Sequence, residues 1–228
     1  VELISSKPTD FVENNLRRLL LQNGLTYKID EVSKYAEELY ENWRKTGKAT
    51  DSSLRSFVLS HISSSSLMND EIFDWMMQDV TNPTTLDSRE ITLAALGHTK
   101  NPELIKRLLN SILDPEVVPT MDAHYLGVSL ANNRHSSDVF WEFFKENYDT
   151  FYKIMSTNMV VLDRFIGQTL GLSHLDSRAD DIEKFFSGKN IHGFERSYAK
   201  VIDSTRSRAK YYQKGSASVK KWLEENKF

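Results

Sequence analysis

Pairs of apolar residues recur one helical turn apart between Asn101 and Asp149, and this pattern constrains the fold of the 228-residue chain more than any other feature. Asn101 can cap a helix, and Pro102 suits its first position because the missing amide hydrogen has no acceptor there. The predicted apolar faces are Leu104, Ile105, Leu108, Leu109 and Ile112, then Met121, Tyr125 and Val128, and then Val139, Phe140, Phe143 and Phe144. Helices this short are marginal alone, so each apolar face must pack against a neighbour.

Cap residues and helix terminators predict more helices on both sides of this stretch. Towards the N-terminus, the predicted helices are 8–23 (capped by Thr9 or Asp10, ended by Gly24), 30–46 (opened by Asp30, ended by Gly47), one opened by Thr50 or Asp51, one from Asn69 to Asn82-Pro83, and 86–96. Towards the C-terminus, they are 151–155, 159–170, 179–186, 193 or 194 to about 212, and 216–226. Ser63–Ser66 is predicted to be a loop, because serine is a poor residue for a helix interior.

The spacing of these elements predicts the architecture. Helices begin roughly every 15 to 22 residues, a period typical of HEAT, armadillo and tetratricopeptide arrays, and no segment alternates in the manner of a strand. We therefore predict an all-α fold: a right-handed α-α superhelix of stacked antiparallel helix pairs, irregular and HEAT- or armadillo-like, with about 12–13 helices. No stretch has the composition of a linker, so residues 1–228 are predicted to form a single domain.

Composition and motifs argue against most kinds of chemistry. A net charge of −3 and a pI near 6.1 disfavour a whole-domain nucleic-acid binder, and the absence of cysteine excludes disulfides and thiolate metal sites. No two of the six histidines lie within five residues, so no HExxH zinc motif exists. No glycine-rich phosphate loop or G-x-S-x-G motif is present either, and no apolar run is long enough to span a bilayer. We expect no catalytic residues and no cofactor in this chain.

The C-terminal segment is locally basic. Its cations are Arg196, Lys200, Arg206, Arg208, Lys210, Lys214, Lys220 and Lys221. A solvated helix end, in which Arg208, Lys210 and Lys214 complement the helix dipole, is favoured over contact with RNA or a ribosome. The aromatic residues at helical spacing, including Trp75 and Trp141, are predicted to be core residues rather than a ligand site.

Several motifs resemble a known family. They are ALGHTKNPELIKRLL (95–109), Met121-Asp122-Ala123, SLANNR (129–134), WEFFKENYDTFYK (141–153), DDIEKFF (180–186) and the final SRAKYYQKGSASVKKWLEEN (207–226). Together they resemble the C-terminal helical domain of zinc aminopeptidases of the puromycin-sensitive type, closest to the fungal cytosolic members. The resemblance covers essentially all 228 residues.

The chain also departs from the pattern of that family. Pro119 and Met121 stand where the family often has arginine and glutamine, and only Asp122 of that motif matches. Ser136 and Ser137 replace a Gly-Arg pair, and Tyr148 replaces a tryptophan, which indicates a divergent member. The candidate peptide contacts are Asp122, together with His124 and Arg134 at the flanks of the helix after Pro119. For His124 and Arg134, ordinary core or surface roles are favoured over ligand contact.

The resemblance implies a role for the chain. In that family this domain is not catalytic: it covers the active site, closes a chamber and contacts the far part of the peptide, which improves positioning at the reacting bond. The implied partners are the catalytic domain of its own parent chain, which would hold the zinc, and a peptide substrate. The chain begins at Val1 without Met, so we expect a domain cut from a larger cytoplasmic aminopeptidase.

Two alternatives remain open at this point. The chain could be a free-standing helical-repeat scaffold that binds a protein, a nascent chain or a ribosome. It could also belong to a divergent aminopeptidase that binds peptides with altered catalysis. The upstream coding sequence, searched for HExxH, discriminates between the first alternative and the aminopeptidase domain.

Overall fold

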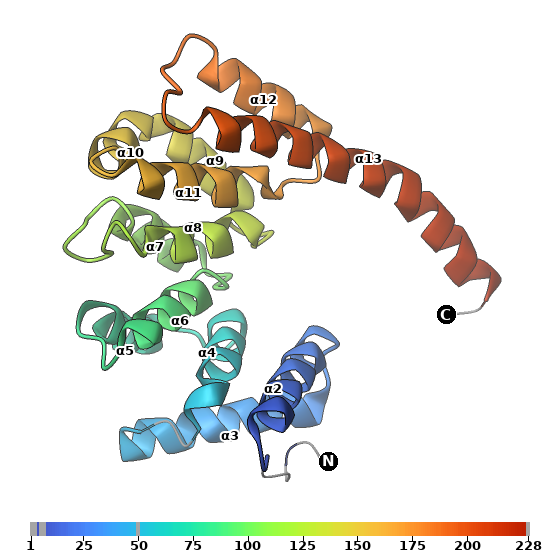
Figure 1. The fold of residues 1–228 in the computed structure, drawn as a ribbon. Coiled ribbons are helices and arrows are strands. Elements are labelled where there is room, and N and C mark those ends of the chain that lie inside the picture. Colours follow the sequence, from blue (N-terminus) through green and yellow to red (C-terminus); the bar gives the residue numbers. More distant parts are fainter. Residues whose placement is uncertain (1–3, 5–7, 49–50, 227–228) are drawn as a thin grey trace. The chain divides into compact units, whose positions relative to one another are not determined.

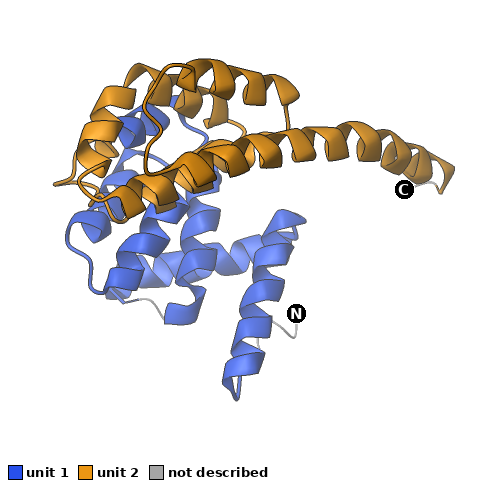
Figure 2. Cartoon of the chain, turned by 45° about the horizontal axis from the view of Figure 1, so that its top comes forward, with its two compact units in different colours: residues 1–110 blue, residues 111–228 orange. Residues whose placement is uncertain are grey.

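A computed structural model describes residues 4, 8–48 and 51–226 of the chain. This part contains twelve α-helices, two short 3₁₀ helices and no strand, which confirms the predicted all-α fold and its helix count. The structure divides into two compact units, residues 1–110 and 111–228, shown in different colours in Figure 2. The prediction of a single domain stays a prediction.

Unit 1 is built from stacked helices (Figure 1). They are α2 (Phe11–Thr26), α3 (Asp30–Thr46), η1 (Ser52–Leu54), α4 (Arg55–Ser64), α5 (Asp70–Thr81), α6 (Leu86–Leu96) and α7 (Pro102–Ser111). Short connections fold consecutive helices back on each other, and α4 packs against α2, α3 and α6, while α5 packs against α6. Phe57 and Phe73 are fully buried in this unit, and Arg107 of α7 lies over the ring of Phe73 at 4.2 Å.

Unit 2 repeats the arrangement with a more aromatic core. Its helices are α8 (Ala123–Asn132), α9 (Ser137–Glu146), α10 (Tyr148–Met155), α11 (Met159–Thr169), η2 (Leu170–Leu172), α12 (Asp176–Phe186) and α13 (Glu195–Glu225). Helix α11 packs between α8 and α13, and α12 pairs with α13. Phe144, Phe151 and Phe165 form a buried cluster with ring centroids 5.1 to 6.3 Å apart.

Local capping chemistry accounts for several helix starts. Asp10 accepts a hydrogen bond from the amide of Glu13, and Asn69 accepts one from the amide of Ile72 at 2.9 Å, so both predicted caps are confirmed. Asn101 accepts from the amide of Glu103, directly before Pro102. The predicted stops at Gly47 and Asn82 are also confirmed. Of the two predicted openers of α4, Asp51 caps η1, and Thr50 lies outside the described residues.

Several predicted helix boundaries are wrong. Helices α10 and α12 begin at Tyr148 and Asp176, each three residues before its predicted start. Helix α2 continues past Gly24 to Thr26, because this glycine serves a close approach to α3: a Cβ there would lie 2.9 Å from Cγ2 of Val32. Ser63 and Ser64 belong to α4 rather than to a loop, and the hydroxyl of Ser64 donates to the carbonyl of Ser60 at 2.9 Å. The last two predicted helices are one 31-residue helix, α13.

The apolar faces of α7 are as predicted, but two other predicted faces are rotated. Met121 precedes α8 and is 53% exposed, whereas Leu126 and Leu130 of α8 are fully buried. Val139 is 51% exposed, whereas Phe140 and Phe144 are buried as predicted, together with Trp141. Since Arg208, Lys210 and Lys214 lie well inside α13, their predicted role at a helix C-terminus is also wrong.

Candidate functional site

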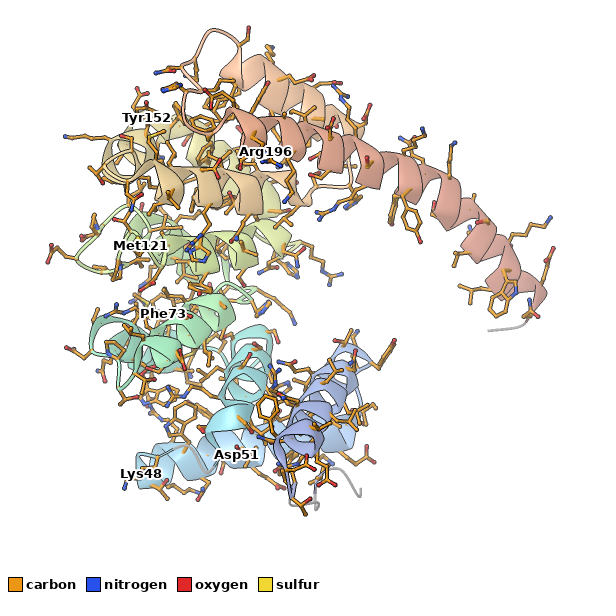
Figure 3. The ribbon with its side chains drawn as sticks, in the orientation of Figure 1. Lys48, Asp51, Phe73, Met121, Tyr152 and Arg196 are labelled. Atoms are coloured by element: carbon orange, nitrogen blue, oxygen red, sulfur yellow. The ribbon has the colours of Figure 1, made fainter. Side chains whose placement is uncertain are left out.

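Two of the three sequence-predicted contact residues lie together at the start of α8. Asp122 is the N-cap residue of that helix, although its side chain makes no capping hydrogen bond. His124 is 9% exposed, its Nδ1 donates to the carbonyl of Met121 at 3.0 Å, and its ring lies 4.0 Å from that of Tyr125. Met121, which directly precedes Asp122, is labelled in Figure 3. These contacts fix the orientation of the imidazole ring.

Arg134 follows the other end of α8 and is exposed. The ten residues of α8 rise about 15 Å, so the structure does not bring Arg134 together with Asp122 and His124. The Nε of Arg134 donates to Nε2 of His135 at 3.2 Å. A peptide contact at any of the three residues stays a prediction.

Arg134 does line a pocket of about 280 Å³ in unit 2. Arg178 and His174 also line it, and sequence reasoning missed both as candidate site residues because they lie forty or more residues further along the chain. Arg178 pairs with Asp138 and lies over the ring of Trp141 at 5.6 Å. The pocket thus offers two guanidinium groups next to an indole ring, an arrangement suited to an anionic group beside an apolar one.

The indole N–H of Trp141 also donates a hydrogen bond to the carboxylate of Asp181. This hydrogen bond is 2.6 Å long, and the ammonium of Lys145 donates to the same carboxylate oxygen at 3.0 Å. The hydrogen bond from Trp141 and then that from Lys145 lower the pKa of Asp181, outweighing the effect of burial. These hydrogen bonds hold the side chain of Trp141, which lines the pocket, in place; they do not position a reacting group.

A cleft of about 680 Å³ lies in unit 1, bounded by α3, α4, α5 and α6. Trp43 and Trp75 line it, and their rings meet edge to face at 5.2 Å. The core position predicted for Trp75 is therefore only partly correct, since this side chain is half-buried at the cleft. Figure 3 shows Lys48, another lining residue, at the end of α3.

The basic C-terminal segment is partly neutralised within unit 2. Arg206 pairs with Asp176, Asp180 and Glu183 of α12, and the carboxylates of Asp180 and then Glu183 raise the pKa of its guanidinium. Arg208 donates to the carbonyl of Gly171 at 2.8 Å. From Lys210 onwards, nearly every described side chain of α13 is exposed.

Across residues 8–48 and 51–226, no group of three His, Asp or Glu side chains is arranged to hold a metal ion. Within the same ranges, no helix is both long and apolar enough to cross a lipid bilayer.

Comparison with known proteins identifies relatives of this chain. Aminopeptidase 2 of Candida albicans is 21% identical over 226 residues, which cover 98% of this chain and 24% of that protein. Alanine/arginine aminopeptidase of Saccharomyces cerevisiae is 23% identical over 96% of this chain and 25% of its own length. "Aminopeptidase 2, mitochondrial" of Saccharomyces cerevisiae is 29% identical over 147 residues, covering 64% of this chain and 15% of that protein.

The chain thus spans about a quarter or less of these relatives, all of which are aminopeptidases. The predicted resemblance to aminopeptidases, fungal ones among them, is confirmed. A family model described as the ERAP1-like C-terminal domain matches residues 2–207. Because that match covers most of the sequence, the chain belongs to the ERAP1-like C-terminal domain family.

Proposed function

We propose that this chain is the non-catalytic C-terminal domain of a cytoplasmic zinc aminopeptidase, in which it covers the active site and helps to bind and select the peptide. One observation carries the proposal: a C-terminal domain family matches residues 2–207, and the chain aligns with only a quarter of proteins named as aminopeptidases. Zinc, its ligands and the catalytic groups would then belong to the remainder of the parent protein.

The exposed face of α2 supports a partner surface in the parent. Val12, Leu16, Leu19 and Leu20 recur at helical spacing, and all are exposed. An apolar groove of about 520 Å³ continues from this helix to Val32 of α3. Contiguous apolar surface of this kind is typical of a protein interface, and the catalytic domain of the parent chain is the proposed partner.

Peptide binding would use the pocket of about 280 Å³ in unit 2. Arg134 and Arg178 supply positive charge there, and Trp141 supplies an apolar surface. Such a site, distant from the reacting bond, would contribute binding energy and orientation rather than chemistry. The winding of the helices into a right-handed superhelix that closes a chamber is part of this proposal.

The isolated chain tests the non-catalytic part of the proposal. We expect metal analysis of the pure 228-residue chain to find no stoichiometric zinc, and aminoacyl reporter substrates to remain intact. Zinc at one equivalent, or hydrolysis that copurifies with the chain through several columns, would contradict it.

The parent protein tests the peptide-binding part. Arg134→Gln in the parent should raise KM for a peptide of about ten residues while leaving KM for a single-residue reporter unchanged. Lys106→Gln, an exposed change on α7, serves as the matched control. Equal effects of Arg134→Gln on both substrates would argue against a contact with the distal part of the peptide.

A scaffold function is the alternative, and the end of α13 favours it. The family match ends at residue 207, and the segment 208–226, which is exposed apart from Ala209 and Gly215, carries five basic and two acidic side chains. Binding to ribosomes or RNA should then weaken steeply between 50 and 200 mM salt. Cosedimentation that is lost in a chain ending at residue 209 would support the scaffold. An HExxH motif upstream in the same gene would support the aminopeptidase.

A further inference from the structure

The cleft of about 680 Å³ in unit 1 has the size of a small-molecule site. Its apolar wall consists of the indoles of Trp43 and Trp75 together with Leu59 and Met76. Polar side chains also line it, eight of the thirteen lining residues, with Arg55 on α4 and Asp79 on α5 facing each other. This cleft is separate from the pocket that the proposed function uses, since it lies wholly within unit 1.

The guanidinium of Arg55 is poorly satisfied for a side chain that is only 16% exposed. Its Nε is buried without a hydrogen-bond acceptor in the described structure. The carboxylate of Asp79 is 4.0 Å from Nη1, which is beyond hydrogen-bond distance. Asp79 is committed elsewhere, because it accepts hydrogen bonds from Thr92 at 2.7 Å and from Ser88 at 3.1 Å.

Other arginines of the chain do find acceptors. Arg17 donates to the hydroxyl of Tyr35 at 2.8 Å, Arg178 pairs with Asp138, and Arg208 donates to the carbonyl of Gly171. Arg55 instead lies over the ring of Trp43, with its Cζ 5.0 Å from the centroid. A cation-π contact uses the face of the guanidinium; because Nε is buried, the in-plane N–H donors of the two Nη atoms are the ones that can serve a ligand in the cleft.

We propose that this cleft binds a carboxylate carried on a small apolar or aromatic body. The guanidinium fork of Arg55 can hold both oxygens of a planar carboxylate, while the indoles of Trp43 and Trp75 cover the apolar part. Asp79 disfavours a more highly charged anion such as phosphate, because its own negative charge lies 4.0 Å from Arg55. The inference goes beyond the proposed function and holds whether or not the parent is a peptidase.

Titration calorimetry on the 228-residue chain tests this, with phenylacetate as the probe. We expect phenylacetate to bind at least 10-fold tighter than phenylacetamide, which has the same shape without the charge. Acetate and inorganic phosphate should both bind at least 10-fold more weakly than phenylacetate. N-acetylphenylalanine distinguishes the source of the acid: if it binds as well as phenylacetate, a peptide-borne carboxylate fits, and if it binds more weakly, a free organic acid fits.

Two variants assign the binding to Arg55. Arg55→Gln should weaken phenylacetate binding at least 10-fold, and Arg55→Lys, which keeps the charge but loses the fork, should weaken it by less. Arg18→Gln, an exposed arginine on α2, should leave binding unchanged. Equal affinity for the acid and the amide would overturn the proposal, as would no detectable binding of either, or unchanged binding in the folded Arg55→Lys and Arg55→Gln variants.

Discussion

At the scale of single residues, Asp181 shows how one surface carboxylate ties α9 to α12. Its pKa is lowered mainly by the hydrogen bond from Trp141 and further by Lys145, so its stabilising effect is present above the ordinary carboxyl pKa and is lost as pH falls through the lowered value. We expect Asp181→Asn to reduce the free energy of unfolding by about 1 kcal/mol at pH 7, a modest figure because the carboxylate is partly exposed, and by much less near pH 2.

Urea unfolding at pH 7 and at low pH measures this difference. Asp203→Asn, at an exposed position of α13, is the matched control and should change little at either pH. A cost for Asp181→Asn that does not shrink at low pH would show that the charge of Asp181 is not the stabilising factor.

Tyr148 presents the opposite case, a buried hydroxyl without a hydrogen-bond partner among the described residues. Burial raises the pKa of Tyr148 to about 12, and its ring packs against Phe144, Phe185 and Phe186. Tyr148→Phe keeps these ring contacts and removes the unsatisfied group, so the free energy of unfolding at pH 7 should stay the same or rise by up to about 1 kcal/mol.

The pH dependence sharpens that prediction. An unfolded tyrosine releases its proton near pH 10, whereas folded Tyr148 holds its proton to about pH 12. The stability contributed by the raised pKa is therefore lost as pH rises through this window, and Tyr148→Phe should lose less stability between pH 10 and 12 than the unchanged chain. Tyr27→Phe, whose ring is 78% exposed, should not show this difference in a denaturant titration.

Sequence spacing could not predict the polar contacts that define the cleft and the pocket. Arg55 and Asp79 are 24 positions apart and meet only because α4 and α5 both pack around α6. Arg178 reaches Asp138 from 40 positions away. The six histidines, by contrast, could be dismissed as an HExxH zinc site from their spacing alone, because both ligands of that motif lie within one helical turn.

At the scale of helices, two glycines inside helices have opposite roles. A Cβ on Gly127 of α8 would lie 2.8 Å from the ring of Phe165 and 2.9 Å from Thr169 on α11, so Gly127→Ala should cost about 1–3 kcal/mol of stability. A Cβ on Gly215 of α13 would meet its nearest neighbour only at 3.9 Å, so Gly215→Ala should stabilise by up to about 1 kcal/mol through helix propensity.

Thermal unfolding of both variants provides the comparison, with each glycine as the control for the other. A rise in Tm for Gly127→Ala would mean that α8 and α11 do not approach as closely as described. A fall in Tm for Gly215→Ala would indicate that the end of α13 is covered by something other than solvent.

Helix starts that carry a capping side chain could be predicted well, and helix faces and ends less so, for a physical reason. A cap such as Asn69 acts on amides of its own first turn, so the signal is local. The exposure of Val139 beside the buried Phe140 depends on where α8 and α11 lie, and the continuation of α2 past Gly24 depends on Val32 of α3. Such outcomes are set by neighbours that a single stretch of sequence does not specify.

At the scale of the whole chain, each unit has a size typical of an independent domain and its own buried core, around Phe57 and Phe73 in unit 1 and around Phe144 and Phe165 in unit 2. We therefore expect two unfolding transitions in denaturant. Leu93→Ala in unit 1 and Leu162→Ala in unit 2 each remove a fully buried side chain, at a cost of about 2–5 kcal/mol. Each substitution should lower the midpoint of one transition and leave the other in place.

The same experiment decides whether residues 1–228 act as the single domain that the repeat pattern predicts. In stacked arrays each helix pair contacts mainly the next, and cooperativity extends only as far as those interfaces are strong. Tryptophan fluorescence separates the units in part, because Trp43 and Trp75 lie in unit 1 and Trp141 in unit 2. One transition, shifted equally by Leu93→Ala and Leu162→Ala, would contradict independent units, because coupling between the two cores would then exceed the stability of either alone.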